Sequence, residues 1–80
     1  MTAMASASYV VEEVWRAARA AGVRDPSVIA ARAGDLLEAL ATARPDGPVG
    51  VFFDAADDAE LDWFFTLLDR RTDALVQAQA

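Results

Sequence analysis

Three aspartates in the last third of the chain come closest, by type and spacing, to a binding site. Asp62, Asp69 and Asp73 recur at intervals that place them as neighbours along one side of a helix. Such a row of carboxylates can bind a divalent cation or an arginine-rich surface. A cation such as calcium requires about six to eight converging oxygen ligands, more than one helix supplies. We therefore expect no metal site here, and the row favours docking of a basic surface.

A second apolar face accompanies this acidic row. The expected core side of the segment consists of Leu61, Phe64, Phe65, Leu68, Thr72, Leu75 and Val76. Trp63 and Leu67, together with Ala56 and Ala74, lie about 120–160° away from it on a helical wheel. An amphipathic surface helix needs only one apolar stripe. The second stripe is therefore either covered by another part of the chain or exposed as a contact patch, and the sequence leaves both possibilities open.

Missing residue types exclude most catalytic chemistry. The chain has no Cys, His or Lys. It therefore has no zinc-finger ligands, thiol nucleophile, imidazole base or Schiff-base lysine. Carboxylates can do acid–base work when burial separates their pKa values, but the sequence does not bring two of them to one cleft. We expect no catalytic residues and no cofactor, while a non-catalytic subunit of an enzyme complex stays possible.

Length and charge limit the class of protein further. Eighty residues make one small domain, and the net charge is -6 without an evident basic cluster. This charge argues against nucleic-acid backbones and anionic membrane surfaces, because both attract Lys and Arg. The sequence contains neither a signal-peptide pattern nor an apolar run long enough to cross a membrane. We expect a cytoplasmic protein, and the Ala- and Arg-rich composition without Lys or Asn is typical of a high-GC bacterium.

Apolar spacing predicts the elements that position these residues. Residues 1–7 are expected to be a flexible N-terminal leader, and residues 8–80 a single small helical domain. The first helix is predicted at about 8–21, with Gly22 as its C-cap. The second is predicted at 26–43, because Asp25-Pro26 is a start signal and Pro45 an end signal. Gly34 leaves open a break in this second helix.

The apolar stretch at 49–53 precedes the last predicted helix. A lone strand has no partner within the chain, so we expect a short extended connector on the core or a strand paired across a dimer. Asp54 is predicted to cap a last helix at about 55–76. The fold class expected is therefore all-α, a three-helix bundle with one extended apolar connector.

Two stretches in the middle of the chain resemble known families. Asp25-Pro26-Ser27-Val28 resembles the serine-containing helix start of acyl carrier proteins, but a proline separates Asp from Ser and the long preceding loop is absent. The stretch 28–34 resembles the first helix of a helix-turn-helix unit. The recognition helix this resemblance implies, 35–43, carries none of the Arg, Lys, Asn or Gln side chains that commonly read bases. Neither resemblance predicts the function.

Surface recognition is the function that the sequence favours. We expect a small acidic protein–protein interaction module, an accessory, adaptor or regulatory subunit that binds a partner or a second copy, for example as a homodimer, through its last helix. The expected contact residues are Trp63, Leu67, Phe52, Phe53, Asp62, Asp69 and Asp73. An accessory subunit that contributes to an enzyme's small-molecule pocket is the alternative. A nucleic-acid mimic or a degenerate helix-turn-helix protein is favoured less.

Overall fold

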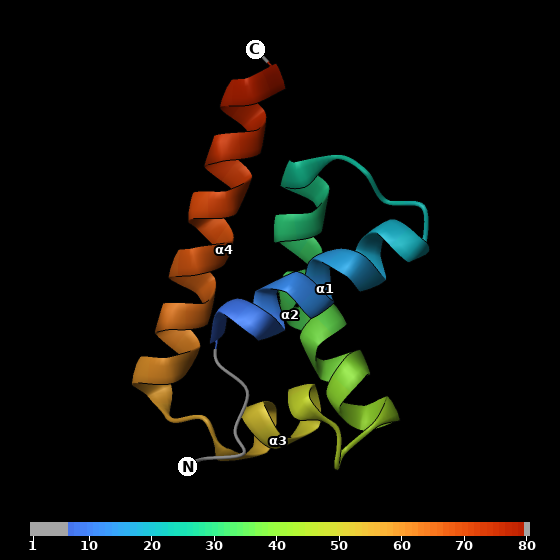
Figure 1. The fold of residues 1–80 in the computed structure, drawn as a ribbon, viewed down its shortest axis with the longest axis vertical. Coiled ribbons are helices and arrows are strands. Elements are labelled where there is room, and N and C mark those ends of the chain that lie inside the picture. Colours follow the sequence, from blue (N-terminus) through green and yellow to red (C-terminus); the bar gives the residue numbers. More distant parts are fainter. Residues whose placement is uncertain (1–6, 80) are drawn as a thin grey trace.

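Four helices form over residues 7–79, the part of the chain that the computed structural model describes (Figure 1). They are α1 (Ala7–Ala20), α2 (Pro26–Ala43), α3 (Pro48–Ala55) and α4 (Asp58–Gln79). The all-α prediction is confirmed, but the expected count of three helices is wrong. Most of the predicted leader, residues 1–6, lies outside the described residues. Its last residue, Ala7, is the buried first residue of α1.

The turn between α1 and α2 follows the predicted signals. Gly22 has a φ of 88°, the left-handed conformation in which a side chain is unfavourable. The amide of Gly22 donates to the Arg19 carbonyl and the amide of Val23 to the Ala18 carbonyl, both at 3.0 Å, which is the Schellman pattern. Asp25 then caps α2 by accepting a 2.9 Å hydrogen bond from the Ser27 amide. This short turn fixes how α1 and α2 cross.

Helix α2 is continuous through Gly34. Its buried positions are Pro26, Ile29, Ala33, Leu37 and Ala41, a spacing of three and four residues that gives one core face. Gly34 is exposed and lies within the helix. The break that the sequence left open is therefore absent.

The expected extended connector at 49–53 is instead the core of helix α3. Gly47 precedes this helix and Pro48 is its first residue, where a fixed φ and a missing amide are tolerated. Val49 and Phe52, three residues apart, are both buried, whereas an extended chain would point them to opposite faces. The β-favouring Val and Phe side chains suggested an extended segment, but packing of this face on α1 and α2 outweighs that local preference.

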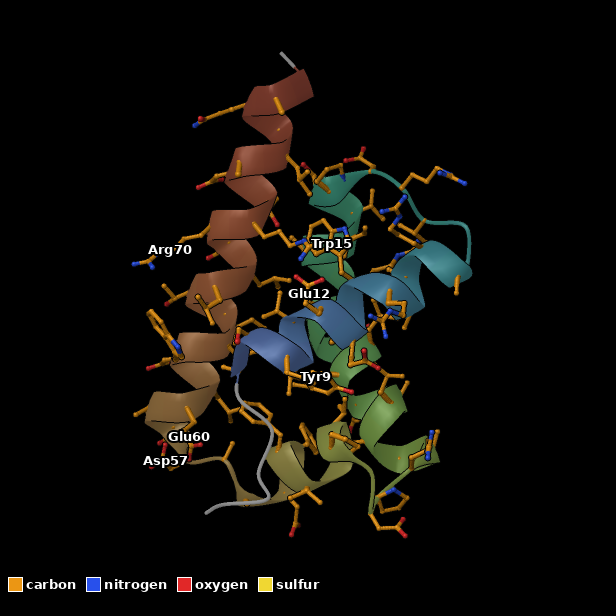
Figure 2. All side chains as sticks on the ribbon, in the orientation of Figure 1. Tyr9, Glu12, Trp15, Asp57, Glu60 and Arg70 are labelled. Atoms are coloured by element: carbon orange, nitrogen blue, oxygen red, sulfur yellow. The ribbon has the colours of Figure 1, made fainter. Side chains whose placement is uncertain are left out.

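Helix α4 begins later than predicted and has a different cap. Asp54 lies within α3, so the prediction that it caps the last helix is wrong. Asp57 takes that place: it accepts a 2.9 Å hydrogen bond from the Glu60 amide, and the Glu60 carboxylate accepts one of 3.4 Å from the Asp57 amide. This reciprocal pair, visible at the start of α4 (Figure 2), is a capping box.

Helix α1 holds the fold together. It packs against α2, α3 and α4, while α4 runs along one side for most of the length of the molecule (Figure 1). Phe52 of α3 and Phe64 of α4 meet beneath it, with ring centroids 6.2 Å apart. The shared core consists of Ala7, Val10, Val11, Val14, Trp15, Ala18, Ile29, Ala33, Leu37, Val49, Phe52, Phe64 and Leu68.

Only part of the expected core side of α4 is buried. Phe64, Leu68 and Thr72 are buried, and the Thr72 hydroxyl donates to the Leu68 carbonyl at 2.9 Å. Phe65 and Val76 were expected in the core but are exposed. On the helical wheel both lie at the edge of the core side, and the Phe65 ring packs edge-on against Phe64 with ring centroids 5.0 Å apart.

Candidate functional site

The outer face of α4 carries the acidic row, defined here as Asp62, Asp69 and Asp73. All three side chains are exposed. On the helical wheel the row lies roughly opposite the buried residues Phe64 and Leu68. The predicted grouping of these carboxylates on one solvent-facing side is therefore present.

Trp63 lies beside the acidic row and is 48% exposed, the highest value among the large apolar side chains described. The Arg70 guanidinium lies 5.3 Å from the centroid of its indole ring. Arg70 points away from the other helices (Figure 2), so Trp63 also belongs to the outward side of α4. Neither the segment 49–53 nor α1 covers this indole, which answers the question left open by the sequence.

The remaining apolar site candidates lie in different environments. Leu67 is half-buried and packs against the core, so only its edge adjoins Trp63. Phe52 is 1% exposed and packs on Phe64, so it stabilises the core instead of forming a surface contact. Phe53 is exposed on α3. The expected single patch is thus reduced to Trp63 and the edge of Leu67, with Phe53 separate on another helix.

Neither a cluster of metal-ligand side chains nor a membrane-spanning helix occurs in the described residues. Nowhere in residues 7–79 do three carboxylates gather closely enough to hold a cation. Within the same range, no helix combines the length and the apolar character that crossing a bilayer requires.

A second charged region lies between α1 and the C-terminal half of α4. Glu12 accepts a hydrogen bond from Nη1 of Arg71, and the Arg71 guanidinium lies 4.9 Å from the centroid of the Trp15 ring. Glu12 and Trp15 are on the side of α1 that faces α4 (Figure 2). Glu12 and Arg16 are four residues apart, a favourable spacing for an ion pair on a helix, but Arg16 pairs with Glu13 at 2.7 Å. Glu12 is thereby free to link the two helices.

Two adjoining depressions surround Trp15 on this side of the molecule. One has a volume of about 490 Å³ and is lined by Glu12, Trp15, Arg16, Arg19, Ala20 and Arg24. The other, of about 240 Å³, is lined by Trp15, Arg19, Arg24, Pro26 and Leu75. Since Trp15, Arg19 and Arg24 line both, we treat them as one surface and call it the arginine groove.

Sequence reasoning missed the arginine groove. Arg16 and Arg19 fall on the side of the first predicted helix that is opposite its apolar residues, and the sequence shows no evident basic cluster. The turn at Gly22 brings Arg24 back beside Arg19, so three of the seven arginines line one surface. The spacing of Arg16, Arg19 and Arg24 across a predicted turn was the one available signal.

Comparisons with protein-family models, with curated proteins and with solved structures gave no match.

Proposed function

We propose that the chain is a small non-catalytic protein–protein interaction module that acts through the outer face of α4. The exposed Trp63 ring carries this proposal, because a large aromatic side chain left half in water is a common anchor of interfaces. In the proposed complex the ring enters a pocket on the partner. The edge of Leu67 extends the apolar contact.

The acidic row supplies the polar rim of this proposed interface. Asp62, Asp69 and Asp73 attract a basic partner and orient it before Trp63 is buried. Exposed charges act within a Debye length of about 8 Å at physiological ionic strength. The row is therefore expected to raise the association rate more than the final affinity.

A single substitution tests the module. Trp63→Asp removes the anchor and places a charge in the proposed contact, while α4 keeps its buried side. We expect the complex isolated with the tagged chain from its own host to fall to the monomer mass in native mass spectrometry. Tyr9→Asp is the matched control, since Tyr9 is an aromatic residue of similar exposure (44%) on α1.

One outcome of this experiment supports the proposal, and two others refute it. Loss of the complex with Trp63→Asp but not with Tyr9→Asp, at equal helix content by circular dichroism, supports the proposal. An unchanged complex with Trp63→Asp, or a wild-type chain that is monomeric and free of partners in its host, would refute it.

A further inference from the structure

The arginine groove contains cations that the described residues leave without an acidic partner. Arg71 is paired with Glu12 and Arg16 with Glu13. Arg19 and Arg24 form no ion pair within residues 7–79. Arg19 lies in the last turn of α1, where a positive charge is favourable near the helix C-terminus. That effect does not account for Arg24, which lies in the turn after α1.

The acidic row is equally unpaired. Asp62, Asp69 and Asp73 form no ion pair with any arginine in the described range. In a chain of net charge -6, two surfaces of opposite sign therefore lie open on one molecule. Their groups fit one another, because a guanidinium can bind a carboxylate through two parallel hydrogen bonds.

The two surfaces cannot meet within one molecule. Arg71 and Leu75 place the arginine groove on the inward side of α4, where that helix packs beside α1. The acidic row is exposed and lies roughly opposite the buried residues Phe64 and Leu68 of the same helix. Only another molecule can bring an acidic helix face to the groove.

We propose that the arginine groove of one copy receives the outer face of α4 of a second copy, so that the chain associates head to tail. The inference rests on the proposed function because it assigns a partner to the same α4 face. Residues 62–73 span about 16 Å of helix, over which the three aspartates can reach Arg19 and Arg24. Trp63 is buried beside them in the same contact.

The positions of the acidic row and the arginine groove also determine the symmetry of the proposed assembly. A two-fold dimer uses the same patch on both copies, whereas here one patch binds a different one on the opposite side. Such an interface leaves one groove and one acidic row free at the ends of any assembly that has not closed into a ring. The association therefore continues to a ring or an open chain instead of stopping at two copies.

Complementary charge reversal tests this inference on the purified chain. The groove variant is Arg19→Glu with Arg24→Glu, and the row variant is Asp62→Arg with Asp69→Arg. We expect the wild-type mass, measured by light scattering, to rise with protein concentration. Each variant alone should weaken self-association by at least about tenfold, and an equal mixture of the two should restore it.

Matched controls carry the same charge changes elsewhere. Arg32→Glu with Arg44→Glu, and Asp35→Arg with Asp46→Arg, alter exposed side chains outside both surfaces and should leave the mass profile unchanged. Restored association in the mixture also shows that both double variants are folded. About 0.5 M salt should dissociate the wild-type assembly, since the Debye length falls to a few ångströms.

Three results would overturn the inference. They are a wild-type chain that is monomeric at every concentration, a groove variant that associates like wild type, and an oligonucleotide that binds the wild-type groove in preference to a second copy. If the purified chain is monomeric while its host complex is still lost with Trp63→Asp, the proposed function stands and only the second-copy partner is rejected.

Discussion

Arg71 connects α4 to α1 through both an ion pair and an aromatic contact. Its guanidinium binds Glu12 across the α1–α4 contact and lies over the ring of Trp15. Its Nε atom is buried without a hydrogen-bond partner. The free-energy cost of desolvating this atom offsets part of the stabilisation from the ion pair and the cation–π contact. The Glu12 side chain is about half exposed, so the ion pair itself contributes at most about 1 kcal/mol.

Replacing Arg71 by Met should measure this balance. The substitution keeps an unbranched apolar stem and removes the charge. We expect a loss of about 1 kcal/mol in the free energy of unfolding by urea, from the cation–π contact and the ion pair together. Arg70→Met is the control and should change stability by less than about 0.5 kcal/mol, because Arg70 is exposed and its guanidinium lies near the exposed Trp63 ring.

An Arg71→Met variant as stable as the wild type would contradict this expectation. It would mean that the cost of burying Nε without a partner cancels the stabilisation from the ion pair and the cation–π contact. The comparison also bears on the arginine groove, because Trp15 lies between Arg71 and that surface.

Two glycines in helices differ in what surrounds them. A Cβ atom on Gly50 would lie 2.4 Å from the carbonyl oxygens of Arg44 and Pro45. Helix α3 therefore packs directly on the backbone that ends α2, and only glycine permits this approach. Gly34 in α2 has nothing within 4 Å of the same position.

Alanine at these two positions should shift stability in opposite directions. Gly50→Ala should cost about 2 kcal/mol or more, because backbone must move to admit the methyl group. Gly34→Ala should add about 0.5–1 kcal/mol, because alanine favours the helix and restricts the unfolded chain. Thermal unfolding measures both, and a neutral Gly50→Ala would show that α3 can shift freely on α2.

Element prediction from the sequence succeeded where local signals were strong and failed where they competed. Gly22 and Asp25-Pro26 gave the α1–α2 turn because each acts within a few residues. Helix α3 was missed because its Val and Phe residues favour extended chain and its glycine disfavours a helix, so that tertiary packing decides for the helix. Asp54 and Asp57 both suit a helix cap. Glu60, three residues after Asp57, was the deciding signal.

The candidate site was likewise predictable where it depends on local periodicity, and not where it depends on contacts between helices. The acidic row and the position of Trp63 follow from helical periodicity alone, so they were predictable. The burial of Phe52 depends on the turn of α3 toward Phe64, a contact between separate helices. The arginine groove combines arginines of α1 with Arg24 beyond the Gly22 turn, and Leu75 of α4 lines its smaller depression. The spacing of the arginines was therefore readable from the sequence, whereas the contact with α4 was not.

At the scale of the whole molecule, the four helices share one core instead of forming separate units. Helix α1 contacts every other helix, so loss of any element exposes apolar side chains of the rest. The domain is therefore expected to unfold in a single cooperative transition.

The two tryptophans allow a direct test of this cooperativity. Trp15 is buried in the core and Trp63 is exposed, so Trp63→Phe leaves a fluorescence signal that reports on the core alone. We expect the urea midpoint from this fluorescence to coincide with that from far-UV circular dichroism. A lower fluorescence midpoint would mean that the α1–α4 contact opens before the helices melt.

The acidic row and the arginine groove also place charges of opposite sign on the two sides of α4. A positively charged chromatography resin or sensor surface should therefore adsorb the molecule by the outer face of α4, with the groove turned to solution. A negatively charged surface should hold it in the reverse orientation. The choice of support thus decides which of the two surfaces an immobilised sample presents.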